Sequence, residues 1–207
     1  MSGALVYARK LFAKPCEFVC GAPAVENLPP QTLPEIAFVG RSNVGKSSLL
    51  NALVNRRTLA RVSNTPGRTR EINFFRLADT LMLVDLPGYG YARASKSLAA
   101  EWQSQITAYL TARANLRRVV LLIDARRGIM PIDREAMALL DRAAVSYLPV
   151  LTKTDKLKPS ERAEVTAQVA AEAQTHAAAY PEIVATSAEK GDGLDALKRH
   201  LTALAPH

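Results

Sequence analysis

The chain has 207 residues, of which 48% are hydrophobic and 22% are charged, and its formal net charge is +8. This composition is typical of one globular domain, and no apolar run approaches the roughly 18 residues that a membrane-spanning helix needs. The basic N-terminal stretch lacks the apolar core and cleavage site of a signal peptide, so we expect a cytoplasmic protein in which Cys16 and Cys20 are reduced thiols.

The predicted elements alternate between strands and helices along most of the chain. A Pro-rich linker over residues 21–35 precedes a buried strand over 36–40 and a helix over 46–56. Residues 56–70 show no periodicity and are predicted as a loop, and a β-hairpin that turns at Ala78-Asp79 follows. The hairpin strands are predicted over 70–77 and 80–85, further strands over 117–124, 147–153 and 182–188, and further helices over 97–114, 133–143, 160–179 and 193–204.

This alternation predicts an α/β fold with a mostly parallel sheet covered on both faces. The expected architecture has three layers, α-β-α, around a six-stranded sheet in which the hairpin supplies one antiparallel strand. We assign residues 34–207 to this single domain and residues 1–33 to an N-terminal extension and linker. Ligands of such sheets bind at the carboxyl ends of the strands, and the motifs described next fall at such ends.

The first motif, GRSNVGKS at 40–47, lies between a predicted strand and a predicted helix and fits the phosphate-binding P-loop pattern G-x-x-x-x-G-K-[ST]. Its glycines let the backbone turn tightly, so that successive N–H groups face the phosphates at the positive end of the helix. Lys46 is expected to reach the β- and γ-phosphates, and Ser47 to ligate Mg²⁺. The predicted phosphate site of this P-loop NTPase comprises Gly40, Arg41, Ser42, Asn43, Val44, Gly45, Lys46 and Ser47.

A second motif, TKTD at 152–155, ends a predicted strand and fits the guanine-recognition pattern [NT]-K-x-D. Asp155 can accept hydrogen bonds from guanine N1–H and from its 2-amino group, which adenine does not offer in that geometry. Lys153 would pack its stem along the base, and a backbone N–H of the TSA segment at 186–188 would contact guanine O6. The predicted base site comprises Thr152, Lys153, Thr154, Asp155, Thr186, Ser187 and Ala188.

The segment DLPG at 85–88 is predicted to sense the γ-phosphate: Asp85 would hold Mg²⁺ through water, and the N–H of Gly88 would contact the phosphate. Thr69, which directly precedes a strand, is the preferred switch threonine over Mg²⁺, whereas Thr65 is expected to be a turn residue. The predicted switch residues are Gly67, Arg68, Thr69, Arg70, Glu71, Asp85, Leu86, Pro87 and Gly88. The expected catalytic residues are Lys46, Thr69 and Gly88, and the expected metal ligands are Ser47, Thr69 and, through water, Asp85.

Tyr89 occupies the position at which many GTP-hydrolysing domains place a Gln that orients the attacking water. A phenol does not orient water as a Gln side chain does, so we expect slow GTP hydrolysis by the isolated protein. The Tyr89 side chain either retracts to admit another group or packs the loop. An activating cation would be K⁺ held beside the phosphates by a carbonyl of Asn43, or a group supplied by a docking partner.

Positive charge is concentrated beside the predicted phosphate site, because no Asp or Glu occurs from Ile36 to Arg70. The basic segments 56–70 and 91–97 flank that site and are expected to reorder on hydrolysis. They predict a salt-sensitive surface for RNA phosphates, the alternative being two loops with solvated Arg side chains.

Together the motifs resemble the EngB/YsxC/YihA family of bacterial ribosome-biogenesis GTP-binding proteins, within the TrmE–Era–EngA group. The resemblance covers about residues 30–205. The segment TREINFF departs from the family pattern, because many relatives have Gln after this Thr. It is carried by GRSNVGKSSLLNAL, TPGRTREINFF, DLPGYGYA, LTKTDKL and the DARRGI segment that follows the fourth predicted strand. It implies binding of Mg²⁺ with GTP or GDP, and a role in late assembly of the large ribosomal subunit.

Two functions stay open on the sequence. One is a GTPase whose hydrolysis times its release from the large ribosomal subunit or its precursor. The other is a GTP- or GDP-gated placeholder on RNA or the ribosome, in which hydrolysis is incidental. In both, ribosomal RNA is an expected partner, and we expect a monomer without membrane association.

Overall fold

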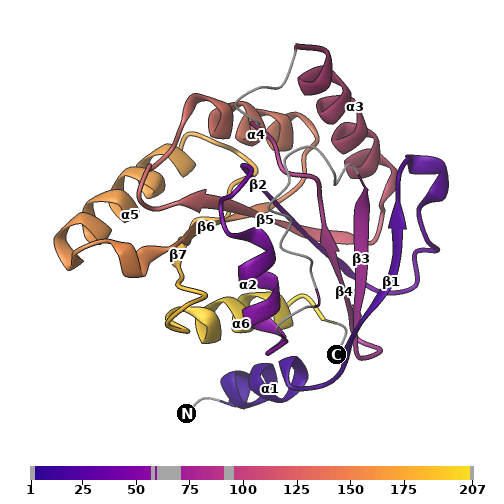
Figure 1. Ribbon diagram of the computed structural model, residues 1–207, viewed down its shortest axis with the longest axis horizontal. Coiled ribbons are helices and arrows are strands. Elements are labelled where there is room, and N and C mark those ends of the chain that lie inside the picture. The colour runs from indigo at the N-terminus through magenta and orange to yellow at the C-terminus, as the bar shows by residue number, and fades with distance from the viewer. Residues whose placement is uncertain (1–2, 57–58, 60–70, 91–95, 206–207) are drawn as a thin grey trace.

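The computed structural model of the chain describes residues 3–56, 59, 71–90 and 96–205. Its centre is a seven-stranded sheet with the strand order β1-β3-β4-β2-β5-β6-β7 (Figure 1). Among these strands β3 alone runs opposite to the other six, so the predicted fold class is confirmed, with seven strands in place of the predicted six. The strands span Cys16–Ala22 (β1), Glu35–Gly40 (β2), Ile72–Leu77 (β3), Leu81–Asp85 (β4), Leu116–Asp124 (β5), Tyr147–Thr152 (β6) and Val184–Ala185 (β7).

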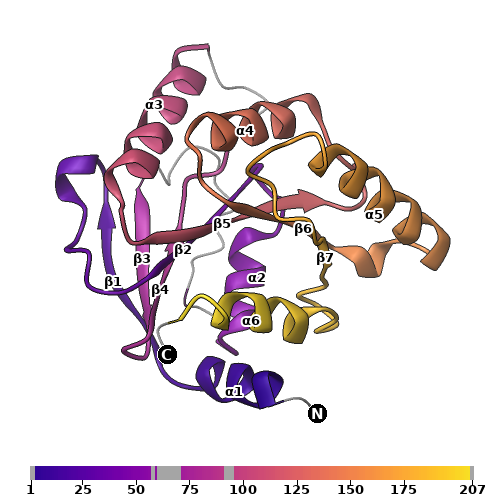
Figure 2. The same ribbon diagram turned by 180° about the vertical axis from the view of Figure 1, so that it is seen from behind.

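Helices cover both faces of the sheet, with α1, α2 and α6 on one face and α3, α4 and α5 on the other (Figures 1 and 2). None of the described helices is both long enough and apolar enough to cross a membrane. The α-helices span Gly3–Phe12 (α1), Lys46–Leu53 (α2), Lys96–Ala112 (α3), Pro131–Arg142 (α4), Pro159–Ala173 (α5) and Leu194–Thr202 (α6), and the 3₁₀ turns Val25–Asn27 (η1) and Thr154–Lys156 (η2).

The central strand β2 shows why its sequence is apolar without alternation. Ile36 and Phe38 belong to the core layer shared with α1, α2 and α6, whereas Ala37 and Val39 belong to the layer shared with α3 and α4. All six residues of β2 are buried. A strand covered on both faces has no solvent side, and its end at Gly40 is therefore held firmly at the carboxyl edge of the sheet.

The seventh strand comes from the segment predicted to be an extension. β1 pairs antiparallel with β3, from Cys16 opposite Leu77 to Ala22 opposite Ile72, with an irregularity between Phe18 and Cys20. Helix α1, which the sequence analysis did not predict, packs against α6 and buries Leu11 and Phe12. Because the middle of β1 is exposed and its register is interrupted, this strand lacks the two-residue alternation that would have identified it.

At the end of β2 that lies away from the P-loop, a buried ion pair joins this strand to the residue that follows α3. Glu35 and Arg113 have side chains that are 1% and 4% exposed, respectively. The Tyr109 hydroxyl donates to Glu35 at 2.9 Å, the Asn115 amide donates at 3.2 Å, and Arg113 also donates to the Pro29 carbonyl at 2.7 Å. Every charge in this cluster therefore has a partner, which is the condition for burying it.

Gly193 begins α6 in a conformation that only glycine adopts easily, with φ of 72°, and an added Cβ would lie 1.9 Å from the carbonyl oxygen of Ala185. We expect Gly193→Ala to lower the free energy of unfolding by about 2–4 kcal/mol, because strain and a backbone clash add. Urea denaturation measures the change. Gly191→Ala is the matched control: its φ is 81° but nothing lies within 4 Å, so only about 1 kcal/mol of strain is expected. If both variants lowered the free energy of unfolding equally, the predicted clash at position 193 would be contradicted.

Candidate nucleotide-binding site

The P-loop turns from the end of β2 into the start of α2 at the carboxyl edge of the sheet (Figure 1). Two of its residues have positive φ, Asn43 at 63° and Gly45 at 104°. Gly45 is the N-cap of α2 and supplies no side-chain cap, so the first N–H groups of the helix are available to an anion. The Thr152 hydroxyl donates to the Val44 carbonyl at 2.7 Å and ties this loop to β6.

Lys46, at the start of α2, forms an ion pair with Asp85 at the end of β4. The parallel pairing of β4 with β2 places Asp85 there, beside Phe38. The two side chains are 13% and 9% exposed, so the pair is largely shielded from water. A phosphate would compete for this ammonium group and Mg²⁺ for this carboxylate, so the residues fit both ligands.

The metal would need the nucleotide for most of its ligands. Ser47 lies in the first turn of α2, directly after Lys46. In the described part of the chain, no group of three or more His, Cys, Asp and Glu side chains is placed to hold a metal ion. Mg²⁺ usually binds through one or two protein oxygens, substrate phosphates and water, which is the arrangement that Ser47 and Asp85 allow.

Hydrogen bonds join the DLPG segment to the P-loop. The N–H of Tyr89 donates to the Gly40 carbonyl at 3.2 Å, and the Tyr89 carbonyl accepts from the N–H of Ser42 at 2.8 Å. An added Cβ on Gly88 would lie 3.3 Å from the Gly40 carbonyl oxygen. The residue that follows the predicted γ-phosphate sensor is therefore hydrogen-bonded through its backbone to the predicted phosphate cradle.

The side chain of Tyr89 packs into the protein and is 4% exposed. Its hydroxyl donates to Asp133 of α4 at 2.8 Å, and its ring meets the edge of Trp102 of α3 with centroids 5.3 Å apart. Burial, together with the nearby Asp133 carboxylate, raises the pKa of Tyr89 well above its ordinary value. This buried position fits both roles considered for Tyr89, namely packing of the loop and retraction that admits another group.

Trp102 and Asp133 were not predicted from the sequence, although both hold the DLPG loop. The Trp102 indole N–H donates to the Pro87 carbonyl at 2.8 Å. Asp133 is 1% exposed and also accepts from the N–H of Met130 at 2.9 Å, which closes the first turn of α4. The only sequence signal was the acidic residue near the start of a predicted helix, which ordinarily indicates a helix cap.

The predicted base-binding residues meet where β6 and β7 end. The hydroxyl and N–H of Thr154 both donate to the Thr186 carbonyl, at 2.9 Å and 3.2 Å, which fixes one loop against the other. Ser187 donates to Oδ1 of Asp155 at 2.7 Å, and this hydrogen bond, with nearby Lys156, lowers the pKa of the Asp155 carboxyl.

The second oxygen of Asp155, Oδ2, is buried and makes no hydrogen bond with any residue that the structure describes. Lys156 Nζ lies 3.0 Å away as an ion pair that lacks hydrogen-bond geometry. An ionised carboxylate whose second oxygen has only an ion-pair partner among the described residues can still accept N–H groups from a ligand. This is the chemistry that the guanine N1–H and 2-amino group would satisfy.

Lys153 links the base site to the phosphate site. Its ammonium group donates to the backbone carbonyl of Asn43 at 2.6 Å and lies 3.0 Å from Oδ2 of Asp124, the last residue of β5. Asp124 was not predicted as a site residue, although it opens the DARRGI segment.

Part of the predicted switch lies outside the described residues, namely Gly67, Arg68, Thr69 and Arg70, as well as Thr65. Glu71, an exposed residue, precedes β3 at the same edge as Asp85, since Asn73 pairs with Asp85. Leu86 is buried, and its N–H donates to the Phe38 carbonyl at 3.0 Å. Ala188 follows Ser187 in the loop after β7, so the described part of the predicted site gathers at one edge of the sheet.

Comparisons with known proteins agree with this geometry. The family model described as "50S ribosome-binding GTPase" matches residues 35–153, and the model of the elongation factor Tu GTP-binding domain matches residues 103–207. A probable GTP-binding protein EngB from Rhodospirillum rubrum is 55% identical, over 98% of this chain and 90% of that protein. Another probable GTP-binding protein EngB, from Ruegeria pomeroyi, is 57% identical over 92% of this chain and 88% of that protein.

Solved structures agree as well. A crystal structure of a probable GTP-binding protein EngB superposes with a TM-score of 0.65 at 26% identity, over 82% of this chain and 97% of that one. Fold and site together define a P-loop GTPase, which binds GTP and GDP. The extent and identity of the matches then place it more narrowly, and the chain belongs to the EngB family of GTP-binding proteins.

Proposed function

We propose that this protein is a slow, Mg²⁺-dependent GTPase that acts as a nucleotide-gated switch in assembly of the large ribosomal subunit. The observation that carries the proposal is that the Lys46–Asp85 pair, the P-loop and the Asp155 carboxylate lie together at the carboxyl ends of the strands. The ribosomal part is supported by the description of the matching family, a 50S ribosome-binding GTPase.

In the proposed site, Lys46 binds the β- and γ-phosphates, and Ser47 and Asp85, the latter through water, hold Mg²⁺. Mg²⁺ held by these residues would supply positive charge beside the phosphates. Gly88 would offer its N–H to the γ-phosphate, and Thr69 would complete the switch. Asp155 and a backbone N–H of residues 186–188 would identify guanine, while Lys153 would cover the base.

Slow hydrolysis follows in this proposal from the position of Tyr89. Its hydroxyl is engaged by Asp133, so residue 89 supplies no group to orient the attacking water. GTPases without full activation turn over at roughly 10⁻⁴–10⁻² s⁻¹, and a supplied cation adds about 10³–10⁵. The two proposed sources of that cation are K⁺ at a carbonyl of Asn43 and a group from the ribosomal partner.

A Tyr89→Phe variant separates packing from catalysis. We expect GTP hydrolysis to stay within about threefold of the unmodified rate, and the free energy of unfolding to fall by about 1–3 kcal/mol because Asp133 loses a buried donor. Single-turnover hydrolysis and urea denaturation measure the two effects. Tyr7→Phe, at a residue that is 49% exposed, is the control and should change neither. A hydrolysis rate that falls tenfold or more in Tyr89→Phe would show that the phenol acts in the reaction.

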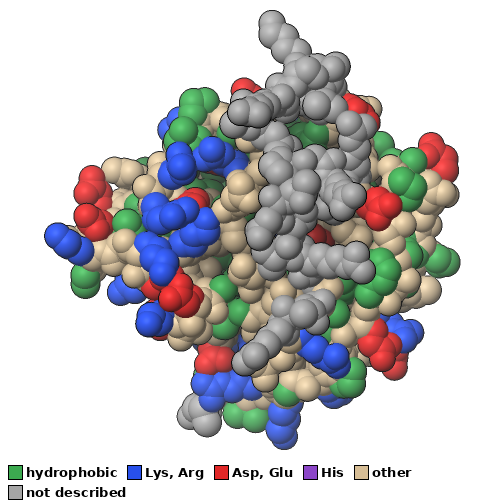
Figure 3. Space-filling view, viewed as in Figure 1, with side chains coloured by type: hydrophobic (Ala, Val, Ile, Leu, Met, Phe, Trp, Pro, Cys, Tyr) green, Lys and Arg blue, Asp and Glu red, His purple; other side chains and the backbone are tan. Residues whose placement is uncertain are grey.

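The proposed partners are the large ribosomal subunit or its precursor, through ribosomal RNA. A group of Lys and Arg side chains lies beside α4 and α5, on the face that Figure 3 shows. An Era structure solved with MgGDPNP and nucleotides of 16S ribosomal RNA matches at 26% identity and a TM-score of 0.65, over 86% of this chain and 58% of that one. We propose that the basic segments 56–70 and 91–97 contact RNA phosphates and that the protein acts as a cytoplasmic monomer.

The second candidate is a nucleotide-gated placeholder on the ribosome in which hydrolysis is incidental, and the buried Tyr89 favours it. Single-turnover GTP hydrolysis in K⁺ and in Na⁺ buffer, with and without purified large subunits, separates the two. Acceleration by subunits of 10²-fold or more is the result expected for the proposed GTPase. Tight GTP binding without acceleration in any of the four conditions would favour the placeholder. Acceleration by K⁺ alone would assign the cation to the site near Asn43.

A further inference from the structure

The Lys153 ammonium group is held by two partners, although it lies at the end of a long, flexible stem. The backbone of Lys153 has φ of 58°, its ammonium group donates to the Asn43 carbonyl at 2.6 Å, and the same group lies 3.0 Å from Oδ2 of Asp124. Its side chain is 26% exposed and that of Asp124 is 8% exposed, so the contact is partly shielded from water. Shielding strengthens such a charge-assisted hydrogen bond.

Asp124 is itself held in place by the residue two positions further on. Arg126 donates to Oδ1 through Nε at 2.9 Å and through its backbone N–H at 3.1 Å, and to Oδ2 through Nη2 at 2.7 Å. These hydrogen bonds and the contact with Lys153 outweigh burial and lower the pKa of Asp124 to about 2. The carboxylate is therefore ionised and fixed in orientation at neutral pH.

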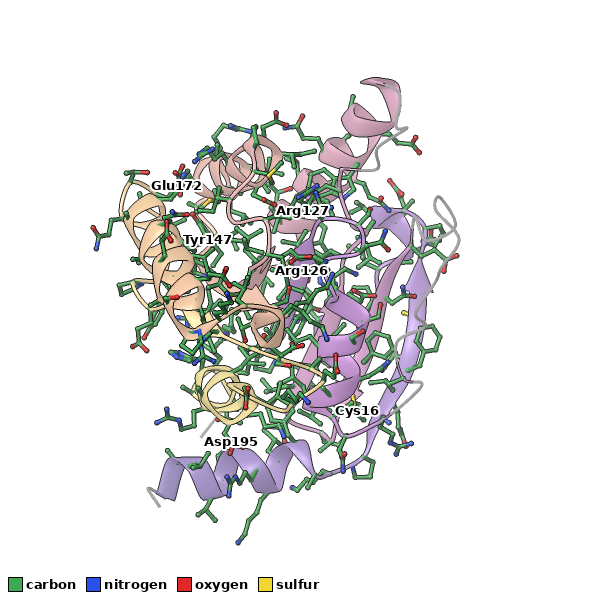
Figure 4. All side chains as sticks on the ribbon, turned by 60° about the vertical axis from the view of Figure 1, so that its left-hand side comes forward. Cys16, Arg126, Arg127, Tyr147, Glu172 and Asp195 are labelled. Atoms are coloured by element: carbon green, nitrogen blue, oxygen red, sulfur yellow. The ribbon has the colours of Figure 1, made fainter. Side chains whose placement is uncertain are left out.

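The position of Asp124 follows from the sheet. β5 lies between β2, which leads to the P-loop, and β6, which leads to Lys153, and Asp124 pairs in register with Thr152. The end of β5 thus lies between the two loops that Lys153 joins. Figure 4 shows Arg126 and Arg127 after β5, between α5 and the strands on the other side of the molecule.

We propose that Asp124 is a positioning residue for guanine-nucleotide binding, acting through Lys153. Its carboxylate keeps the ammonium group at the Asn43 carbonyl, so that the stem of Lys153 is already extended across the place where the base binds. Without Asp124 the stem would recover rotamer freedom, which nucleotide binding would have to remove again. This inference rests on the proposed function, because it assumes that the base lies against Lys153.

A double-mutant cycle tests the proposal. The dissociation constant of GDP is measured by competition with a fluorescent guanine nucleotide for the unmodified protein, Asp124→Asn, Lys153→Met and the double variant. We expect Asp124→Asn to weaken GDP binding about tenfold and Lys153→Met to weaken it by at least as much. The double variant is expected to bind GDP as Lys153→Met does, because Asp124 has no effect once Lys153 is gone.

Two further variants test whether the change in GDP binding is merely structural. Glu172 on α5 accepts two hydrogen bonds from Arg134, at 2.8 Å and 3.0 Å, in a similar fork. Glu172→Gln removes this carboxylate and should leave the dissociation constant of GDP within twofold of that of the unmodified protein. Arg126→Ala removes the other partner of Asp124. The backbone N–H of Arg126 still holds Oδ1 in this variant, so GDP binding is expected to weaken less than in Asp124→Asn. If Arg126→Ala weakened GDP binding equally with and without Lys153, the effect would not act through Lys153 and the proposal would be wrong.

The remaining outcomes are equally decisive. Additive losses in the cycle, or GDP binding by Asp124→Asn that equals that of the unmodified protein, would overturn the role of Asp124 while leaving the guanine site intact. Failure of the unmodified protein to prefer GDP over ADP would overturn the proposed function instead.

Discussion

Asp155→Asn is expected to change the preferred base from guanine to xanthine. The carboxylate can accept both guanine N–H groups, whereas an amide accepts one hydrogen bond and donates the other. Xanthine carries a carbonyl in place of the 2-amino group, so it matches the amide. The lost hydrogen bond to a charged group is worth about 1.5–3 kcal/mol, so GDP binding should weaken by about 10–10²-fold, while xanthosine diphosphate binds more tightly than GDP.

Competition titrations with GDP, ADP and xanthosine diphosphate measure this exchange. Asp192→Asn is the matched control, because Asp192 is an exposed residue of the neighbouring loop and should leave all three affinities unchanged. Oδ2 of Asp155 is the structural reason to expect a large effect, since among the described residues it is paired only with the Lys156 ammonium group and makes no other contact. GDP binding that is unchanged in Asp155→Asn would place the base elsewhere.

The second large effect concerns stability. Glu35→Ala is expected to lower the free energy of unfolding by about 3–5 kcal/mol, because it leaves the Arg113 charge buried without its partner and removes the acceptor of the Tyr109 hydroxyl. Domains of this kind are stable by about 5–15 kcal/mol, so the loss is a large part of the total. Urea denaturation at constant pH, with GDP absent, measures it.

Glu17→Ala is the control for removing a carboxylate. Glu17 pairs with Arg76 across β1 and β3, but the two side chains are 62% and 48% exposed, and such pairs contribute at most about 1 kcal/mol. If Glu35→Ala and Glu17→Ala lowered the free energy of unfolding equally, the buried cluster would not have the importance that its burial implies.

Much of the fold was predictable because most strands are buried on both faces or paired in a short hairpin. The apolar run that forms β2, the hairpin of β3 and β4, and the alternation with helices needed no tertiary information. β1 and α1 were missed for a physical reason. Their stability comes from contacts made across the chain, β1 with β3 and α1 with α6, whereas their own sequences carry an interrupted and partly exposed pattern.

In the site, motifs identified the residues that would touch the nucleotide, and the described ones do lie at one edge of the sheet. The sequence did not identify Asp124, Asp133 or Trp102, which hold Lys153, Tyr89 and Pro87, respectively. Such supporting residues have no fixed spacing from the groups they hold, because only the fold brings them together. For the same reason the sequence did not identify Asp133 as the hydrogen-bond partner of the Tyr89 hydroxyl.

Nucleotide-dependent sedimentation with large ribosomal subunits tests the switch function most directly. The protein is mixed with purified subunits in the presence of a non-hydrolysable GTP analogue, of GDP or of no nucleotide, at low and at high salt. Our account predicts binding at least tenfold tighter with the GTP analogue than with GDP, and weaker at high salt. Equal binding in all three nucleotide states, or none in any of them, would contradict it.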